Sequence, residues 1–96
     1  MITSELAEAG PWREIASRLQ RFVQDEVLRL GEEAIGLDDP LFETGRVDSM
    51  GLLQIVEHIA REYGVDLLQV GRPADLRTLA ALAEAVVRES AKQGGP

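Results

Sequence analysis

The segment LFETGRVDSM, residues 41–50, marks the point where a polar connection ends and a helix begins. Behind Asp48 and Ser49, apolar residues recur at spacings of three and four, as on one face of an amphipathic helix. Ser49 is therefore predicted at the surface, at a helix start, with no neighbouring base to activate its hydroxyl. That setting favours modification by another enzyme over catalysis by the chain itself.

A first amphipathic helix is predicted from Pro11 to about Leu30. Proline suits the first turn of a helix, and Gly31 suits the residue that ends one. Residues 1–10 precede this helix and are expected to form a flexible leader. The apolar stripe repeats every three or four residues, and its members are Trp12, Ile15, Ala16, Leu19, Phe22, Val23, Val27 and Leu30.

A second helix is predicted from Ser49 to Tyr63, and Gly64 is expected to end it. A spacing of three and four residues again defines its buried face. The residues assigned to that face are Leu52, Ile55, Val56, Ile59 and Tyr63.

The C-terminal third is expected to hold one short helical turn and a last helix that ends near Ser90. Asp75 or Thr78 is expected to cap that helix. The folded domain is expected to span residues 11–90, and residues 91–96 are expected to form a disordered tail.

Residues 31–48 form a long connection between the first two helices, and five apolar residues in it are expected to pack onto the core. Asp38 and Asp39 are expected to start a turn before Pro40. The five apolar residues are Ile35, Leu37, Leu41, Phe42 and Val47. Because no long stretch alternates with period two, the predicted fold is all-α: a small three- to four-helix bundle with a long structured loop.

The composition of the chain excludes several classes of function. The 96 residues fit one domain, and a net charge of -7 disfavours binding to nucleic acid or anionic lipid. The absence of cysteine excludes disulfides and thiol catalysis, and no apolar run is long enough to span a membrane. The N-terminus lacks the pattern of a secretory signal, so a cytoplasmic location is expected.

Side chains with possible chemistry mostly have a structural interpretation. Ser49 could cap its helix through its hydroxyl oxygen. His58 follows nine residues later, on another face of the helix, so it does not form a catalytic pair with Ser49. His58 is expected to be a solvated residue, and Trp12 is expected to anchor the core. No metal site is predicted.

The run from Asp38 to Met50, followed by a helix ending in Glu62-Tyr63-Gly64-Val65, resembles the acyl and peptidyl carrier proteins. The resemblance covers roughly Ile15 to Val87. It implies a four-helix domain in which Ser49 carries a covalent 4′-phosphopantetheine arm and Asp48 helps the modifying enzyme to recognise the site. The terminal thiol of the arm would hold an acyl or aminoacyl group as a thioester.

The resemblance also implies a set of partners. They are a phosphopantetheinyl transferase, a loading ligase (adenylation enzyme) or acyltransferase, and a downstream transferase or synthase. The pattern is most similar to freestanding carriers, such as D-alanyl or aminoacyl carrier proteins of cell-envelope or specialised-metabolite pathways. The second helix is the expected docking surface, through Met50, Leu53, Gln54, Glu57 and Arg61.

Three other functions fit parts of the sequence. An unmodified helical interaction module fits the fold, and a helix-turn-helix DNA-binding protein fits the helix count but not the charge. A hydrolase that uses Ser49 lacks a base. The chain is therefore expected to be a carrier without catalytic residues of its own.

Overall fold

The computed structural model describes residues 2–28, 35–43 and 45–93, and the elements within these ranges are all helical. The α-helices are α1 (Ile2–Phe22), α2 (Ser49–Tyr63), α3 (Leu67–Val70) and α4 (Leu79–Gln93). A π-helix, η1 (Val23–Leu28), continues α1, and a 3₁₀-helix, η2 (Pro73–Leu76), precedes α4. The all-α prediction is confirmed.

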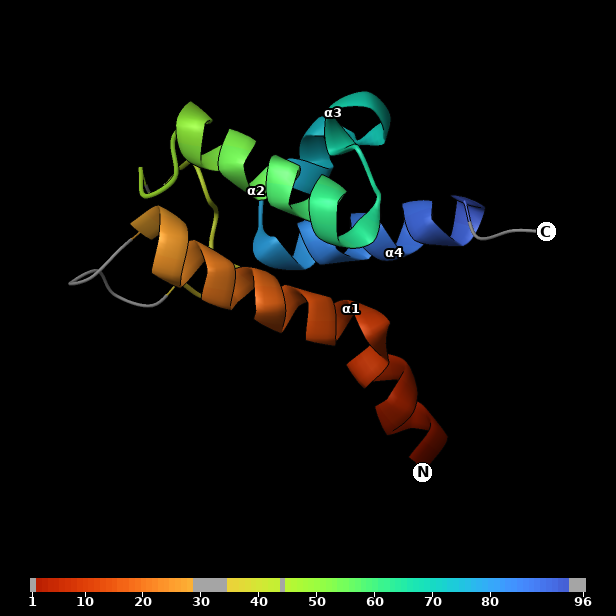
Figure 1. The fold of residues 1–96 in the computed structure, drawn as a ribbon. Coiled ribbons are helices and arrows are strands. Elements are labelled where there is room, and N and C mark those ends of the chain that lie inside the picture. The colour runs from red at the N-terminus through yellow and green to blue at the C-terminus, as the bar shows by residue number, and fades with distance from the viewer. Residues whose placement is uncertain (1, 29–34, 44, 94–96) are drawn as a thin grey trace.

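The helices pack around one apolar core (Figure 1). α1 packs mainly against α4, whereas α2 contacts η1, α3 and α4. The core is aliphatic, as the low aromatic content requires. Its largest fully buried side chains are Leu19, Ile35, Leu41, Ile55, Ile59, Leu67, Leu79, Leu82, Val23, Val47, Val56 and Val65.

The first helix starts earlier than predicted. α1 begins at Ile2 rather than at Pro11, so the proline lies inside the helix. A proline inside a helix removes a backbone hydrogen bond and bends the helix. Accordingly, the first turns of α1 point away from the bundle (Figure 1). The predicted end at Gly31 lies outside the described residues, and whether residues 1–10 are flexible stays a prediction.

The predicted stripe of the first helix is largely confirmed. Ala16, Leu19 and Val23 are fully buried, and Ile15, Phe22 and Val27 pack partly against the core. The prediction for Trp12 is wrong, because this residue is only half-buried and lies outside the core cluster. Its ring instead carries the guanidinium of Arg13, 5.0 Å from the ring centroid. Leu30 lies outside the described residues.

The long connection is tied to the bundle by backbone hydrogen bonds. The amide of Leu41 donates to the carbonyl of Arg77 over 2.8 Å, and the amide of Ala80 donates to the carbonyl of Leu37 over 2.9 Å. Four of the five apolar residues predicted to pack inward do so: Ile35, Leu37, Leu41 and Val47.

Phe42 is the exception and is 41% exposed. Its neighbour Leu41 takes the core position, and the chain then turns sharply. Gly45, at a φ of 76°, donates its amide to the Phe42 carbonyl in this turn. The expected turn at Asp39 is present, because its carboxylate accepts the amide of Gly36 over 2.8 Å.

The second helix has the predicted bounds. Gly64 ends α2 at a φ of 70° and donates its amide to the carbonyl of Ala60. A left-handed conformation at this position suits glycine, which lacks a Cβ. Of the predicted inner face, Ile55, Val56 and Ile59 are buried, whereas Leu52 and Tyr63 are partly buried.

The last helix is capped by Thr78, whose hydroxyl oxygen accepts the amide of Ala81 over 3.0 Å. Asp75, the other predicted cap, instead accepts the amide of Arg72 and belongs to η2. α4 continues to Gln93, beyond its predicted end near Ser90. The part of the expected tail after Gln93 lies outside the described residues. None of the described helices is both long and apolar enough to cross a membrane.

Candidate functional site

Ser49 is the first residue of α2, and its side chain is exposed. The chain reaches it from Val47, which is 2% exposed and donates its amide to the carbonyl of Leu41 over 3.2 Å. Asp48 then adopts an extended backbone, with φ and ψ of -100° and -170°, before the helix begins. The position of Ser49 is therefore fixed by the buried side chain of Val47 on one side and by the start of α2 on the other.

Asp48, and not Ser49, caps α2. Oδ1 of Asp48 accepts the amide of Gly51 over 2.9 Å, and its carbonyl accepts the amide of Leu52 over 2.9 Å. An aspartate at this position satisfies one of the unpaired amides at a helix start and places a negative charge there. The interpretation of Ser49 as the cap is therefore wrong, and α2 does not depend on the serine hydroxyl for its start.

The position of Ser49 suits a phosphate ester. The first amides of a helix and its dipole make the N-terminus favourable for an anion. The serine side chain is at the surface, so an added group meets solvent rather than the core. The residues present therefore fit a covalently attached phosphate-containing group.

His58 does not face Ser49. Its ring stacks on Phe22, with a centroid separation of 4.0 Å and an angle of 11° between the planes. The expectation of a solvated histidine is wrong, because this contact between α1 and α2 leaves His58 half-buried. The stack could not be read from the sequence, since it depends on how two helices pack.

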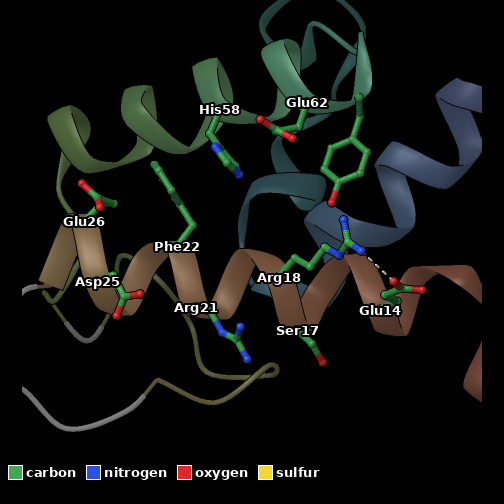
Figure 2. Close-up of a pocket in the computed structure, with 10 residues that line it drawn as sticks. Glu14, Ser17, Arg18, Arg21, Phe22, Asp25, Glu26, His58 and Glu62 are labelled. Atoms are coloured by element: carbon green, nitrogen blue, oxygen red, sulfur yellow. Dashed lines mark hydrogen bonds and ion pairs between the residues drawn. The ribbon is translucent and has the colours of Figure 1, made fainter.

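A groove of about 530 Å³ surrounds this stack between α1, η1 and α2 (Figure 2). Glu14 pairs with Arg18 in it over 3.0 Å, and the hydroxyl of Ser17 points away from His58. Ser17 and His58 therefore form no nucleophile–base pair, although both line the groove (Figure 2). Within the described part of the chain, no group of residues is suited to hold a metal ion.

The predicted docking residues of α2 are all exposed, with Met50 70% and Leu53 40% accessible. Gln54, Glu57 and Arg61 lie on the same outer side of the helix. The sequence analysis missed two further exposed apolar residues on α3, Leu68 and Val70. The short length of the predicted helical turn could have indicated their exposure, because one helical turn cannot direct every apolar side chain toward the core.

The fold and the site define a class of protein. The fold is a small helical bundle, and the site is an exposed serine at the start of its second α-helix. The chain matches the family described as "Phosphopantetheine attachment site" over residues 17–86, and it belongs to that family. None of the curated proteins matches the chain.

Membership of this family gives the cofactor, which is covalently attached 4′-phosphopantetheine. Domains of this family generally have no catalytic activity of their own and work with transferases and biosynthetic enzymes.

Proposed function

We propose that Ser49 carries the 4′-phosphopantetheine arm, and that the protein holds an acyl or aminoacyl group on it for partner enzymes. The observation that carries this proposal is the exposed serine at the start of α2, inside the region that matches the family. The arm supplies a terminal thiol for thioester formation, a group that this cysteine-free chain lacks.

In this proposal, the chain contributes the hydroxyl group of Ser49 and the carboxylate of Asp48 to its recognition and modification by the transferase. Ser49 offers its hydroxyl to a phosphopantetheinyl transferase, which brings the base that removes the proton. Asp48 holds the helix start in place and offers a carboxylate beside the serine for recognition. The protein itself takes no catalytic part, so its partners are the transferase, a loading ligase or acyltransferase, and a downstream transferase or synthase.

The docking surface in this proposal is the outer side of α2, formed by Met50, Leu53, Gln54, Glu57 and Arg61. Two exposed apolar side chains close to Ser49 can fill pockets on a partner. Early in the helix, Gly51 and Gln54 are neutral, where the fatty-acid carriers bear acidic residues. This departure favours a dedicated partner over a fatty-acid synthase.

The proposal therefore includes a freestanding carrier, similar to D-alanyl or aminoacyl carriers, in a specialised-metabolite or cell-envelope pathway. It retains the cytoplasmic location expected from the sequence. Neither nucleic acid nor the membrane is a partner, in keeping with the net charge of -7.

Intact mass measurement tests the modification. The purified protein is incubated with coenzyme A, magnesium and a promiscuous phosphopantetheinyl transferase. We expect a gain of one phosphopantetheine in the unchanged protein and none in Ser49→Ala, which keeps its helical circular dichroism because Asp48 caps α2.

Ser17→Ala and Ser90→Ala are matched controls that should gain the group normally. Modification of Ser49→Ala would contradict the assignment of the serine. A folded, unchanged protein that gains no mass with two different transferases would favour the unmodified interaction module.

A further inference from the structure

Gly51 lies in the first turn of α2 and is buried. Glycine is a poor helix former, because its backbone loses more conformational freedom on folding than that of any other residue. Gly51 also has ordinary helical geometry, since the described glycines with positive φ are Gly45 and Gly64. Its presence therefore calls for an explanation from packing.

The surroundings of Gly51 provide that explanation. A Cβ atom added to this residue would lie 3.0 Å from Cγ1 of Val27 and 3.1 Å from Cγ1 of Val47. Ordinary van der Waals contacts between carbon atoms are about 3.5–4.0 Å. A side chain at position 51 would therefore require Val27 and Val47 to move by a few tenths of an ångström, whereas glycine lets the start of α2 approach η1 and the end of the loop without this displacement.

The same residue contributes to the cap, because its amide donates to Oδ1 of Asp48. Gly51 thus joins three segments at one point: the π-helix through Val27, the loop through Val47 and the helix start through Asp48. Gly51 makes all of these contacts from the first turn of α2, which is also the turn that bears Ser49.

The direction of the contact matters for the serine. Residues two positions apart in an α-helix are separated by roughly 200° around the helix axis. Ser49 therefore points nearly opposite to the side of α2 where Gly51 meets Val27. A side chain at position 51 would push the helix start away from η1 and change how Ser49 sits relative to the loop residue Asp48.

We propose that Gly51 is a positioning residue for the modification of Ser49, and that its close contact with Val27 of η1 sets the place of the serine hydroxyl. This inference rests on the proposed attachment at Ser49. Gly51 touches neither the transferase nor the incoming group in this proposal. It acts through the backbone of the first helical turn.

Steady-state kinetics of phosphopantetheine transfer test the inference. A small misplacement of a reacting atom lowers the rate of the chemical step strongly. We expect kcat for transfer to fall several-fold in Gly51→Ala and by about tenfold or more in Gly51→Leu, with a smaller change in KM for the carrier, because the exposed docking side chains remain. Ala60→Leu adds a side chain to the exposed side of the same helix and should leave kcat unchanged.

A second substitution separates positioning from a general loss of structure. Val27→Ala removes one of the two methyl groups that the new Cβ would meet, the other being Cγ1 of Val47, so Gly51→Ala combined with Val27→Ala should recover part of the lost kcat. Val27→Ala alone should be modified at close to the normal rate, and melting temperatures of all variants are measured alongside.

The outcomes distinguish the two proposals. Transfer to Gly51→Ala and Gly51→Leu at the unchanged rate would overturn the positioning role and leave the attachment at Ser49 intact. A loss of kcat that Val27→Ala does not relieve even in part would overturn the role of the contact with Val27. Failure of the unchanged protein to be modified would instead overturn the proposed function on which the inference depends.

Discussion

At the scale of single residues, Asp48 and Ser49 are neighbours with separate tasks. The aspartate accepts the amide of Gly51 and lies just before α2, whereas the serine is the first residue inside it. Because the cap is supplied by Asp48, Ser49 can take on a bulky group without the helix losing its first hydrogen bonds. The proposed attachment at Ser49 is therefore compatible with the position of this residue inside a regular helix.

Two substitutions at Asp48 separate its structural task from recognition by the transferase. Asp48→Ala removes the cap and should lower the free energy of unfolding by about 1 kcal/mol. Asp48→Asn can still accept the amide of Gly51, so its unfolding free energy should stay close to that of the unchanged protein. We expect both variants to be modified more slowly, as measured by chemical denaturation and transfer kinetics. Normal modification of Asp48→Asn would show that the transferase does not read the carboxylate.

At the scale of elements, an ion-pair cluster joins η2 to α4. Arg88 donates hydrogen bonds to both carboxylate oxygens of Asp75, over 2.7 and 3.3 Å, and a third to Glu89 over 3.0 Å. Both carboxylates are largely buried, and Lys92 donates a further bond to Glu89 over 3.3 Å. The hydrogen bonds from Arg88 lower the pKa of Asp75 below its ordinary value, and they lower that of Glu89 as well.

Asp75→Asn tests the contribution of this cluster to stability. The amide side chain keeps the shape of Asp75 but loses the charge that Arg88 binds, so we expect a loss of about 1.5–3 kcal/mol of unfolding free energy near neutral pH. Because the folded-state pKa of Asp75 is lowered, its contribution is complete above the ordinary value of 3.8 and is lost as pH falls through the folded-state pKa.

The difference in stability between Asp75→Asn and the unchanged protein should therefore shrink at acid pH, as followed by urea unfolding. Asp66→Asn is the matched control, because Asp66 is an exposed cap of α3 that accepts the amide of Leu68. A difference that stays constant down to the acid limit would show that the charge of Asp75 does not stabilise the fold.

At the scale of the whole molecule, two features are notable: the first turns of α1 project from the bundle (Figure 1), and apolar residues are exposed on α2 and α3. The radius of gyration is 13.5 Å, compared with about 12.5 Å expected for a compact chain of this length, because the first turns of α1 project (Figure 1). Among the exposed large apolar residues, Met50 and Leu53 lie on α2, and Leu68 and Val70 lie on α3. On a chain of net charge -7, such residues favour docking through apolar contacts.

Serine substitutions at these positions test the proposed docking surface on α2. Met50→Ser and Leu53→Ser should each raise KM for transfer several-fold with little change in melting temperature, since both side chains are exposed and close to Ser49. Leu68→Ser removes a side chain of similar exposure, 64% against 70% for Met50, but from α3, and should raise KM less. An equal effect of Leu68→Ser would extend the docking surface onto α3.

Local rules were enough where an element depends on its own residues. The bounds of α2 follow from an apolar period of three and four and from a glycine at the position that ends the helix. The same rules misplaced the start of α1, because proline favours a first helical turn but also occurs inside a bent helix. They also overestimated the burial of Phe42 and Trp12, since apolar character alone does not decide which side chains reach the core.

The sequence by itself determined the helical class, the place of Ser49 at a helix start and the resemblance to carrier proteins, because these depend on residues close together in the chain. Only the tertiary structure decided that Phe22 stacks on His58, that Arg88 binds Asp75 and that Gly51 meets Val27. Each of these contacts joins separate elements. Their formation depends on how closely the helices pack, and the pattern of any one segment does not carry that information.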